Sequence, residues 1–345
     1  VYAYETYTNV QRGHRDFNFI MWGRLYAMRY LDLAEQLLRR CGITSRLETS
    51  EVPWTSMTRA GMTYTPYCTS GLQRQEWQTA KKDHRGRRNL IKLNSKGVLI
   101  GNGNGRCWND EPTVTRNLRQ WMEAQRDVRS HGVLAYSMGD EHETIGSCLH
   151  PACLKAYRLY LERQYGTIRR LNASWETTFS DFGQVELSEA GDNCEKQAFA
   201  QGNYPRWFDR RAFQAWNFAN YVGRFGRAAQ EIDPQAKWGV EGTGWLDDDL
   251  DAIVRNSNWW VPYSIPASEV IRSVAPRDYL LGHFVGYSDT NPYYSLSDFW
   301  MSFLRGGNCI AWWRVDNFLA PNFGLSEGSK ELVRSAKIVF EGLGK

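Results

Sequence analysis

The stretch "GVLAYSMGDEHETIGSCLHPACLKAYRLYLERQYG" (residues 132–166) contains one complete unit of strand, loop and helix. Residues 132–138 are an apolar run of strand length, and residues 153–166 carry a helical pattern. Two adjacent acids, Asp140 and Glu141, lie between them, followed by a Cys, a His and another Cys. A strand this apolar is typical of a parallel sheet whose faces are both covered by helices. The stretch therefore predicts a buried parallel sheet.

The same unit recurs along the chain, and its repetition predicts the fold. Strands are predicted over 1–7, 43–49, 62–68, 132–138, 237–242, 259–264, 279–287 and 309–315. Helices are predicted over 22–41, 112–130, 153–166, 209–231 and 330–343. Eight strand–helix units predict an α/β fold of the (β/α)8 TIM barrel type. A doubly wound open sheet is the alternative, and the lack of a glycine-rich phosphate loop after the first strand disfavours it.

The length of 345 residues is ordinary for one barrel, so we expect residues 1–345 to form a single catalytic domain. The polar segment 72–97 is predicted to cross the surface. Segment 176–208 is too long for an ordinary connection and is a second predicted excursion. The chain opens directly in a strand-like run and closes on "FEGLGK", which indicates a mature domain or one excised from a longer chain.

Composition and charge limit the classes of molecule that the protein is expected to bind. The 42 basic and 38 acidic residues give a formal charge of only +4 and form no basic block, which argues against nucleic acid. No apolar run reaches the 18 residues or so of a membrane span. We expect a soluble protein, and the sequence leaves open whether it is cytoplasmic or exported. The 15 Trp and 18 Tyr indicate a Trp-rich core or a site where aromatic rings stack on sugars.

The two acids at the end of the fourth predicted strand are the first candidates for chemistry. In (β/α)8 barrels the reacting groups lie on the loops that follow the strands. Asp140 and Glu141 occupy such a position. The alternative interpretation is a solvated turn or a helix N-cap, where acids are also favoured.

The sequence beyond these acids resembles glycoside hydrolase family 42, the β-galactosidases of clan A. "YLERQYGTIRRLNASWETTF" (160–179) is similar to a run that follows the family's acid/base residue. "NGRCWNDEPTVTRNLRQ" (104–120) looks like the family's segment before strand four. "YPRWFDRRAFQAWNFANYVGRFGRAAQEIDPQAKWGV" (204–240) resembles the long helix before strand five.

The resemblance implies a glycoside hydrolase that acts on β-linked sugars with two carboxylates, and with retention of configuration as the clan's default. Glu141 matches the general acid/base, and Asp140 replaces an Asn that contacts the 2-hydroxyl of the sugar. An adjacent carboxylate disfavours ionisation of Glu141, which suits a general acid. An Asp–Glu pair here also resembles hexosaminidases that use the acetamido group of their substrate as nucleophile, and this is an alternative. Family members are often trimers held partly by later domains, so a homo-oligomer stays open.

The second carboxylate is missing from its expected place. Clan A enzymes carry a nucleophilic Glu at the end of strand seven, but residues 279–291, "YLLGHFVGYSDTN", contain no Glu. Glu241, set among glycines at the end of strand five, is the first replacement as nucleophile or base, and Glu269 after strand six is the second. A buried Glu241 paired with Arg and a helix-stabilising Glu269 are the alternatives. A barrel without any nucleophile would be a non-catalytic carbohydrate-binding protein.

Further residues at predicted strand ends are candidates for substrate binding. Trp312 and Trp313 alternate faces of strand eight, so at most one points into the barrel mouth, where a sugar could stack. Tyr263 ends strand six. Glu5 and Glu48 end the first two strands and are predicted to contact hydroxyl groups.

A cluster of cysteines after the acids predicts a structural zinc site. Cys148, His150 and Cys153, together with Cys107 upstream, match a tetrahedral ligand set with three sulfurs and one nitrogen. The family typically has Cys where His150 stands. With all four positions filled by protein, the zinc would pin the loop that carries Glu141 and take no part in catalysis. Buried free thiols with a capping His, or a Cys148–Cys153 disulfide, are the alternatives.

Overall fold

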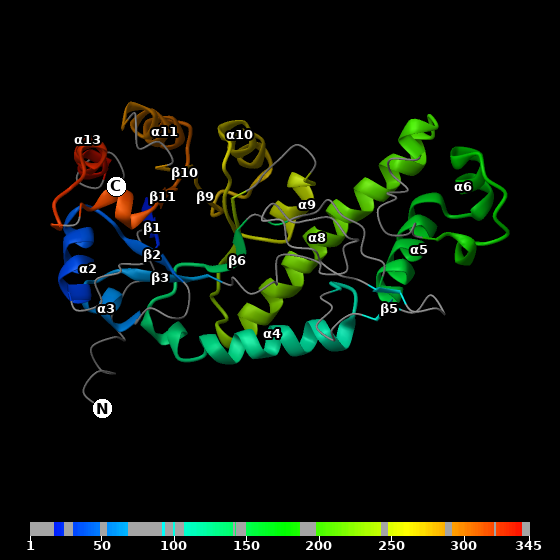
Figure 1. Cartoon of the computed structure of the whole chain (residues 1–345), viewed down its shortest axis with the longest axis horizontal. Helices are drawn as coiled ribbons and strands as arrows, with labels where there is room; N and C mark the ends of the chain where they lie inside the picture. Colours follow the sequence, from blue (N-terminus) through cyan, green and yellow to red (C-terminus); the bar gives the residue numbers. More distant parts are fainter. Residues whose placement is uncertain are drawn as a thin grey trace.

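The computed structural model describes residues 17–23, 30–48, 54–67, 92–93, 99–100, 107–140, 142, 150–186, 198–242, 248–286, 292–320 and 322–339. Parallel strands in these ranges surround a common interior and helices lie outside them (Figure 1). The strands are β1 (Asn18–Trp22), β2 (Ser45–Glu48), β3 (Thr63–Pro66), β6 (Tyr136–Asp140), β7 (Trp238–Glu241), β8 (Trp259–Val261), β9 (Leu280–Leu281), β10 (Phe284–Val285) and β11 (Cys309–Trp313).

The helices alternate with these strands along the chain. They are α2 (Leu31–Arg40), α3 (Trp54–Arg59), α4 (Glu111–Gln125), α5 (Pro151–Tyr165), α6 (Ile168–Trp175), α8 (Tyr204–Ile232), α9 (Leu250–Arg255), α10 (Ile265–Val274), α11 (Pro292–Leu304), α12 (Val315–Phe318) and α13 (Glu327–Ile338). Short 3-10 turns cover Val128–His131 and Phe182–Gln184.

Two parallel sheets, β10-β11-β1-β2-β3 and β6-β7-β8-β9, join at both edges. Between β3 and β6, the amide of Leu134 donates to the carbonyl of Tyr64 at 2.9 Å. On the other side, β9 and β10 are two halves of one strand that Gly282 and His283 interrupt. Gly282 N donates to β8, and the carbonyl of His283 accepts from β11. The sheet therefore closes, and the predicted (β/α)8 barrel is confirmed.

Side chains alternate between the barrel interior and the helix layer. In β11, Cys309 and Ala311 belong to the inner cluster, whereas Ile310 and Trp312 pack with the helices. The inner cluster comprises Ile20, Leu47, Leu134, Ala135, Trp259, Val261, Leu280, Phe284, Cys309 and Ala311. Most residues of the strands are buried on either face.

The first barrel strand differs from the prediction. Residues 1–7 lie outside the described residues, and the strand between β11 and β2 is β1, where Ile20 aligns with Ala311 on one side and Ser45 on the other. The sequence "NFIMW" shows no alternation because both faces are buried, so periodicity cannot distinguish it from the start of a helix. The prediction of 1–7 as barrel strand one was therefore wrong.

Other elements also differ from the prediction. The short helix α3 connects β2 to β3, where the sequence predicted only a brief link. The long helix α8 begins within the predicted excursion 176–208, because Asn203 caps it through the amide of Arg206 and Pro205 suits its first turn. Most of the predicted excursion 72–97 lies outside the described residues.

Helices α5 and α6 form a lobe beyond the barrel, at the far end of α8 (Figure 1). The lobe has its own core, in which Cys153, Leu161 and Trp175 pack with Phe213 of α8. The opposite end of α8 packs against α4 and β7. Within the described residues, none of the helices is both long and apolar enough to cross a membrane.

Candidate functional site

Asp140 and Glu241 end neighbouring barrel strands and face each other in register. The pairing of β6 with β7 contains a bulge, because three steps from Ser137 to Asp140 oppose two from Gly239 to Glu241. Gly139 accommodates the bulge with φ at +127°. A bulge re-aims the side chains that follow it. Ser137 and Asp140 consequently both lie on the side of Glu241.

Glu241 is completely enclosed. It is 0% exposed, and the hydroxyl of Ser137 donates to its Oε1. Its Oε2 has no hydrogen-bond partner within the described part of the chain. Burial first, and then the charge of Asp140, raise the pKa of Glu241 well above its usual value, while Ser137 lowers it only in part. The carboxyl therefore favours its neutral form.

Asp140 is half-buried and is held by Tyr263, which follows β8. The Tyr263 hydroxyl lies 2.7 Å from Oδ1 and 2.6 Å from Oδ2 of Asp140. Gly242 makes this approach possible: a Cβ there would stand 1.9 Å from Oδ1 of Asp140 and 2.7 Å from Cε2 of Tyr263. Three successive strands thus bring two carboxyl groups and a phenol to one point.

Aromatic side chains extend this site across the strand ends. Trp22, Tyr67, Tyr263 and Trp313 are half-buried against the inner cluster. The rings of Trp22 and Trp313 lie 4.1 Å apart between centroids, and Tyr67 meets Trp22 edge-on. Such surfaces can stack on the apolar face of a sugar.

Of the two predicted tryptophans of strand eight, only Trp313 lies on this side. Trp312 is 3% exposed and packs edge-on against Phe318 in the helix layer. Sequence reasoning missed Trp22 because β1 was not recognised, and it missed Tyr67 although that residue lies in the predicted strand 62–68. The side chain of Glu48, which ends β2, and the whole of Glu5 lie outside the described residues, as does Glu141.

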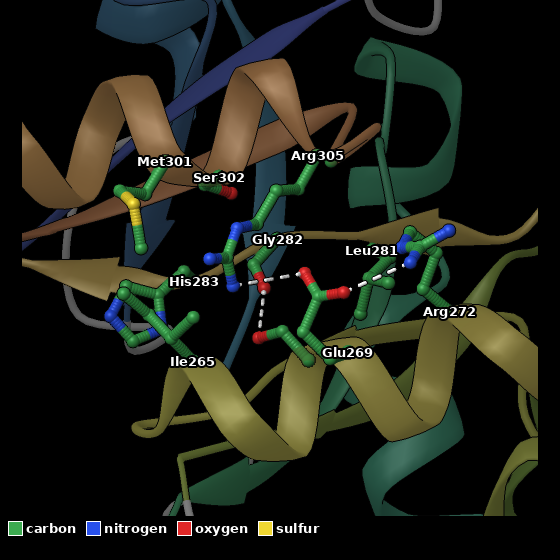
Figure 2. Close-up of a pocket in the computed structure, with 11 residues that line it drawn as sticks. Ile265, Glu269, Arg272, Leu281, Gly282, His283, Met301, Ser302 and Arg305 are labelled. Carbon is green, nitrogen blue, oxygen red and sulfur yellow. Dashed lines mark hydrogen bonds and ion pairs between the residues drawn. The ribbon is translucent and has the colours of Figure 1, made fainter.

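Glu269 lies elsewhere, in a pocket between α10 and α11 (Figure 2). It pairs with Arg272 at 2.9 Å and with Arg305 at 3.5 Å. The hydrogen bond from Arg272 is the main cause of a lowered pKa for Glu269. The pocket also contains His283, whose pKa burial lowers to about 4. The structure therefore does not bring Glu269 together with Asp140 and Glu241.

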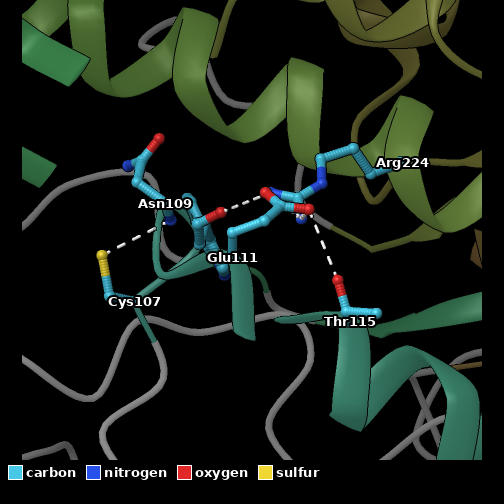
Figure 3. A network of polar contacts seen from close by, with 6 residues as sticks. Cys107, Asn109, Glu111, Thr115 and Arg224 are labelled. Atoms are coloured by element: carbon cyan, nitrogen blue, oxygen red, sulfur yellow. Dashed lines mark hydrogen bonds and ion pairs between the residues drawn. The ribbon is translucent and has the colours of Figure 1, made fainter. Parts of the chain in front are cut away.

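The predicted metal ligands are brought together only in part. Cys107 and Cys153 are buried in the core of the lobe, and Cys148 lies outside the described residues. The amide of Asn109 donates to Sγ of Cys107 at 3.4 Å, beside the ion pair of Glu111 with Arg224 (Figure 3). Across the described ranges, no three His, Cys, Asp or Glu side chains form a group that could hold a metal.

His150 acts as a helix cap in this arrangement. Its Nδ1 accepts from the amide of Ala152 at 3.2 Å, at the start of α5. A neutral imidazole that accepts at Nδ1 carries its proton on Nε2, so neither nitrogen is then ready to bind a metal. The cap is the arrangement that the free-thiol alternative predicts, and a metal would require this hydrogen bond to break.

Comparison with known proteins finds one family model that matches part of the chain and several solved structures with the same fold. The sequence model of glycoside hydrolase family 42, described as beta-galactosidase, matches residues 110–238. No curated protein matches the chain. Among solved structures, the chain is similar to a beta-galactosidase from the psychrophilic Marinomonas ef1, with a TM-score of 0.62, 14% identity, and coverage of 95% of this chain and 60% of that one.

Two further structures show the breadth of the fold. A beta-galactosidase from a Rahnella species matches with a TM-score of 0.68 at 11% identity, covering 96% of this chain and 57% of its own. The catalytic domain of beta-amylase from Paenibacillus polymyxa matches with a TM-score of 0.62 at 12% identity, covering 94% of this chain and 99% of that one. The chain thus spans about 60% of the length of the first beta-galactosidase. Structural similarity at such low identity shows the barrel alone.

Proposed function

Since the chain resembles glycoside hydrolase family 42, we propose that it is a glycoside hydrolase that cleaves β-linked sugars, with galactosides as the first class to test. The observation that carries this proposal is the meeting of Asp140, Glu241 and Tyr263 at the ends of β6, β7 and β8. Reacting groups of (β/α)8 enzymes stand at this end of the strands. The half-buried Trp22 and Trp313 beside them would bind the sugar ring.

Glu141, which directly follows Asp140 in the sequence, is the proposed general acid that protonates the leaving oxygen. Replacement of such an acid by its amide removes the transferable proton, so Glu141→Gln should lower kcat by about 10²–10⁴-fold. Glu269→Gln is the matched control, because its carboxylate lies in the pocket between α10 and α11 and should leave kcat unchanged. Equal loss in both variants would contradict the assignment.

Glu241 is the proposed second carboxylate, but its burial restricts how it can act. An enclosed, neutral carboxyl must lose its proton and meet the substrate before it can attack an anomeric carbon. A nucleophilic role predicts that Glu241→Ala loses hydrolysis and that added azide restores turnover as a glycosyl azide. A supporting role beside Asp140 predicts residual hydrolysis without azide rescue. Retention or inversion would be read from the anomer first released.

A substrate-assisted reaction is the second candidate, and the contrast between Asp140 and Glu241 favours it. Asp140 is half-buried and held by Tyr263, whereas Glu241 is sealed from solvent. A carboxylate in the position of Asp140 can orient an acetamido group that attacks in place of a protein nucleophile. Aryl β-galactosides, β-glucosides and β-N-acetylglucosaminides separate the candidates. Cleavage of the last alone supports substrate assistance, and binding without cleavage supports a carbohydrate-binding barrel.

Structural zinc is a separate proposal. Cys107 and Cys153 share one buried core, and the amide of Asn109 already donates to Cys107, as it would to a thiolate ligand. Cys148 and His150 would complete the set once His150 releases its cap. One equivalent of zinc in purified protein, lost in Cys107→Ser, is expected. Less than about half an equivalent would contradict a four-ligand site.

Homo-oligomer formation also stays a prediction, to be checked by light scattering.

A further inference from the structure

His142 lies two residues after Asp140 and is buried against aromatic rings. Its side chain is 0% exposed and stacks on Phe218 of α8, with 4.1 Å between ring centroids and 14° between planes. Trp260 of β8 lies on another side, at 6.3 Å. The imidazole is therefore fixed in both position and tilt by aromatic packing.

Another edge of this ring meets an acid from a different loop. Nε2 of His142 lies 3.4 Å from Oδ2 of Asp248, whose side chain is 3% exposed. Asp248 follows β7 and precedes α9, so it belongs to the loop that begins after Glu241. A contact between His142 and Asp248 thus connects the loops that follow β6 and β7. We name these two residues the loop latch.

The loop latch joins a second set of contacts at the same strand ends. Trp260, which flanks His142, donates from Nε1 to the carbonyl of Gly242 at 3.1 Å. Asp140, on the other side of Glu141 in the sequence, is held by Tyr263. Both sequence neighbours of Glu141 are therefore bound to groups on or after the next two strands. A buried His–Asp pair is often only structural, but here it connects the loop after β6, to which Glu141 belongs in the sequence, with the loop that follows Glu241.

We propose that the loop latch of His142 and Asp248 positions Glu141 relative to Glu241, with neither latch residue contacting substrate. This inference rests on the proposed glycosidase function. Misplacement of a reacting group by about 1 Å costs up to about a hundredfold in rate. Loss of the latch should therefore lower kcat while leaving KM nearly unchanged, because the aromatic sugar-binding surface is not touched.

The test compares His142→Phe and Asp248→Ala with the double variant. Phe keeps the stack on Phe218 but removes Nε2. Each single variant should lower kcat by about ten- to a hundredfold. The double variant should lose no more than either single variant, because both break one interaction. Asp248→Asn retains an acceptor for the imidazole and should recover most of kcat.

Asp249→Ala is the matched control. Asp249 is the adjacent acid, and its carboxylate caps α9 by accepting from the amide of Ala252 at 2.9 Å. Its removal should lower the stability of the protein slightly and leave kcat unchanged. A fall in kcat for Asp249→Ala that equals the fall for Asp248→Ala would show that any damage to this loop is sufficient, and would overturn the latch.

Hydrogen exchange separates failure of the latch from failure of the proposed function. Wild-type protein that cleaves no glycoside overturns the function. The latch still predicts faster amide exchange in peptides around 137–142 when Asp248 is changed to Ala, but not when it is changed to Asn. Exchange there that equals wild type overturns the latch whatever the activity. If His142→Phe fails to fold, the two Asp248 variants alone decide the outcome.

Discussion

Glu241 makes the stability of the protein depend on pH in a direction that can be worked out. Its folded pKa is raised by burial and by Asp140. The stability that such a group contributes is complete below its unfolded pKa, about 4.3, and is lost as pH rises through the folded value. Glu241→Gln removes this dependence. The variant should therefore gain stability over wild type as pH rises from about 4, measured by urea unfolding across the pH range.

A control of the opposite sign is available at Glu269. Arg272 lowers the pKa of Glu269, so its contribution is present above the unfolded pKa and is lost as the solution becomes acidic. Its effect should be small because the pair is solvent-exposed.

Parallel stability curves for wild type and Glu241→Gln would show that Glu241 is charged in the folded protein.

At Gly242, the effect of a left-handed backbone can be separated from the effect of close packing by comparison with Gly202. Its φ is +64°, and an added Cβ would collide with Asp140 and Tyr263. Gly202 has a similar φ of +77° but open space around it. Gly202→Ala should cost about 1–2 kcal/mol from the left-handed backbone alone. Gly242→Ala should cost more and also lower activity, measured by unfolding and by kinetics on the same samples. Equal effects would mean that Asp140 and Tyr263 move aside freely.

At the scale of elements, a buried ion pair fastens the end of β1. Arg46 of β2 lies 3.1 Å from Glu35 of α2, and both side chains are fully buried. Arg46 also donates to the carbonyls of Met21 and Gly23, on either side of Trp22. Burial raises the pKa of Glu35, and the charge of Arg46 offsets this only partly. The pair therefore holds the backbone that presents Trp22.

Breaking one half of this pair should be costly. Arg46→Met leaves Glu35 and two carbonyls without their donor, and we expect a loss of about 3–5 kcal/mol by urea unfolding. Arg46→Met combined with Glu35→Leu should recover part of that loss, because an apolar pair leaves no uncompensated carboxyl. A double variant less stable than Arg46→Met alone would show that the two carbonyls, rather than Glu35, dominate.

At the scale of the whole molecule, Asp209 joins the lobe to the barrel. It lies on α8 and accepts from the hydroxyl of Tyr165 in α5 and, at 2.7 Å, from the indole of Trp175 in α6. Burial raises the pKa of Asp209. Asp209→Ala should increase amide exchange in α5 and α6 while the barrel strands stay protected, because the lobe has its own core. Asp209→Asn keeps an acceptor and should behave like wild type. Uniform loss of protection would mean that lobe and barrel unfold as one unit.

Sequence predicted the barrel and several strand ends but not the neighbourhood of the acids. The runs around β2, β3, β7 and β11 are short and rich in β-branched, aromatic or aliphatic residues, so their strands were recognised. β1 was missed because burial of both faces removes its alternation. Trp22, at the end of β1, was missed with it. His142 was missed for another reason: its role depends on a contact with Asp248, which comes from another loop. Local pattern carries no signal for such contacts.

The bulge at Gly139 has a consequence for sequence alignment. Three steps along β6 cover the same distance as two along β7. Residues after the bulge therefore point to the opposite side of the strand from the side that simple alternation along the sequence predicts. An alignment that counts residues would pair Asp140 with a position facing the helix layer in any relative without this extra residue. Correspondence between Asp140 and the residues of relatives is therefore best assigned by superposition, and substitutions inferred from aligned columns alone would target the wrong face.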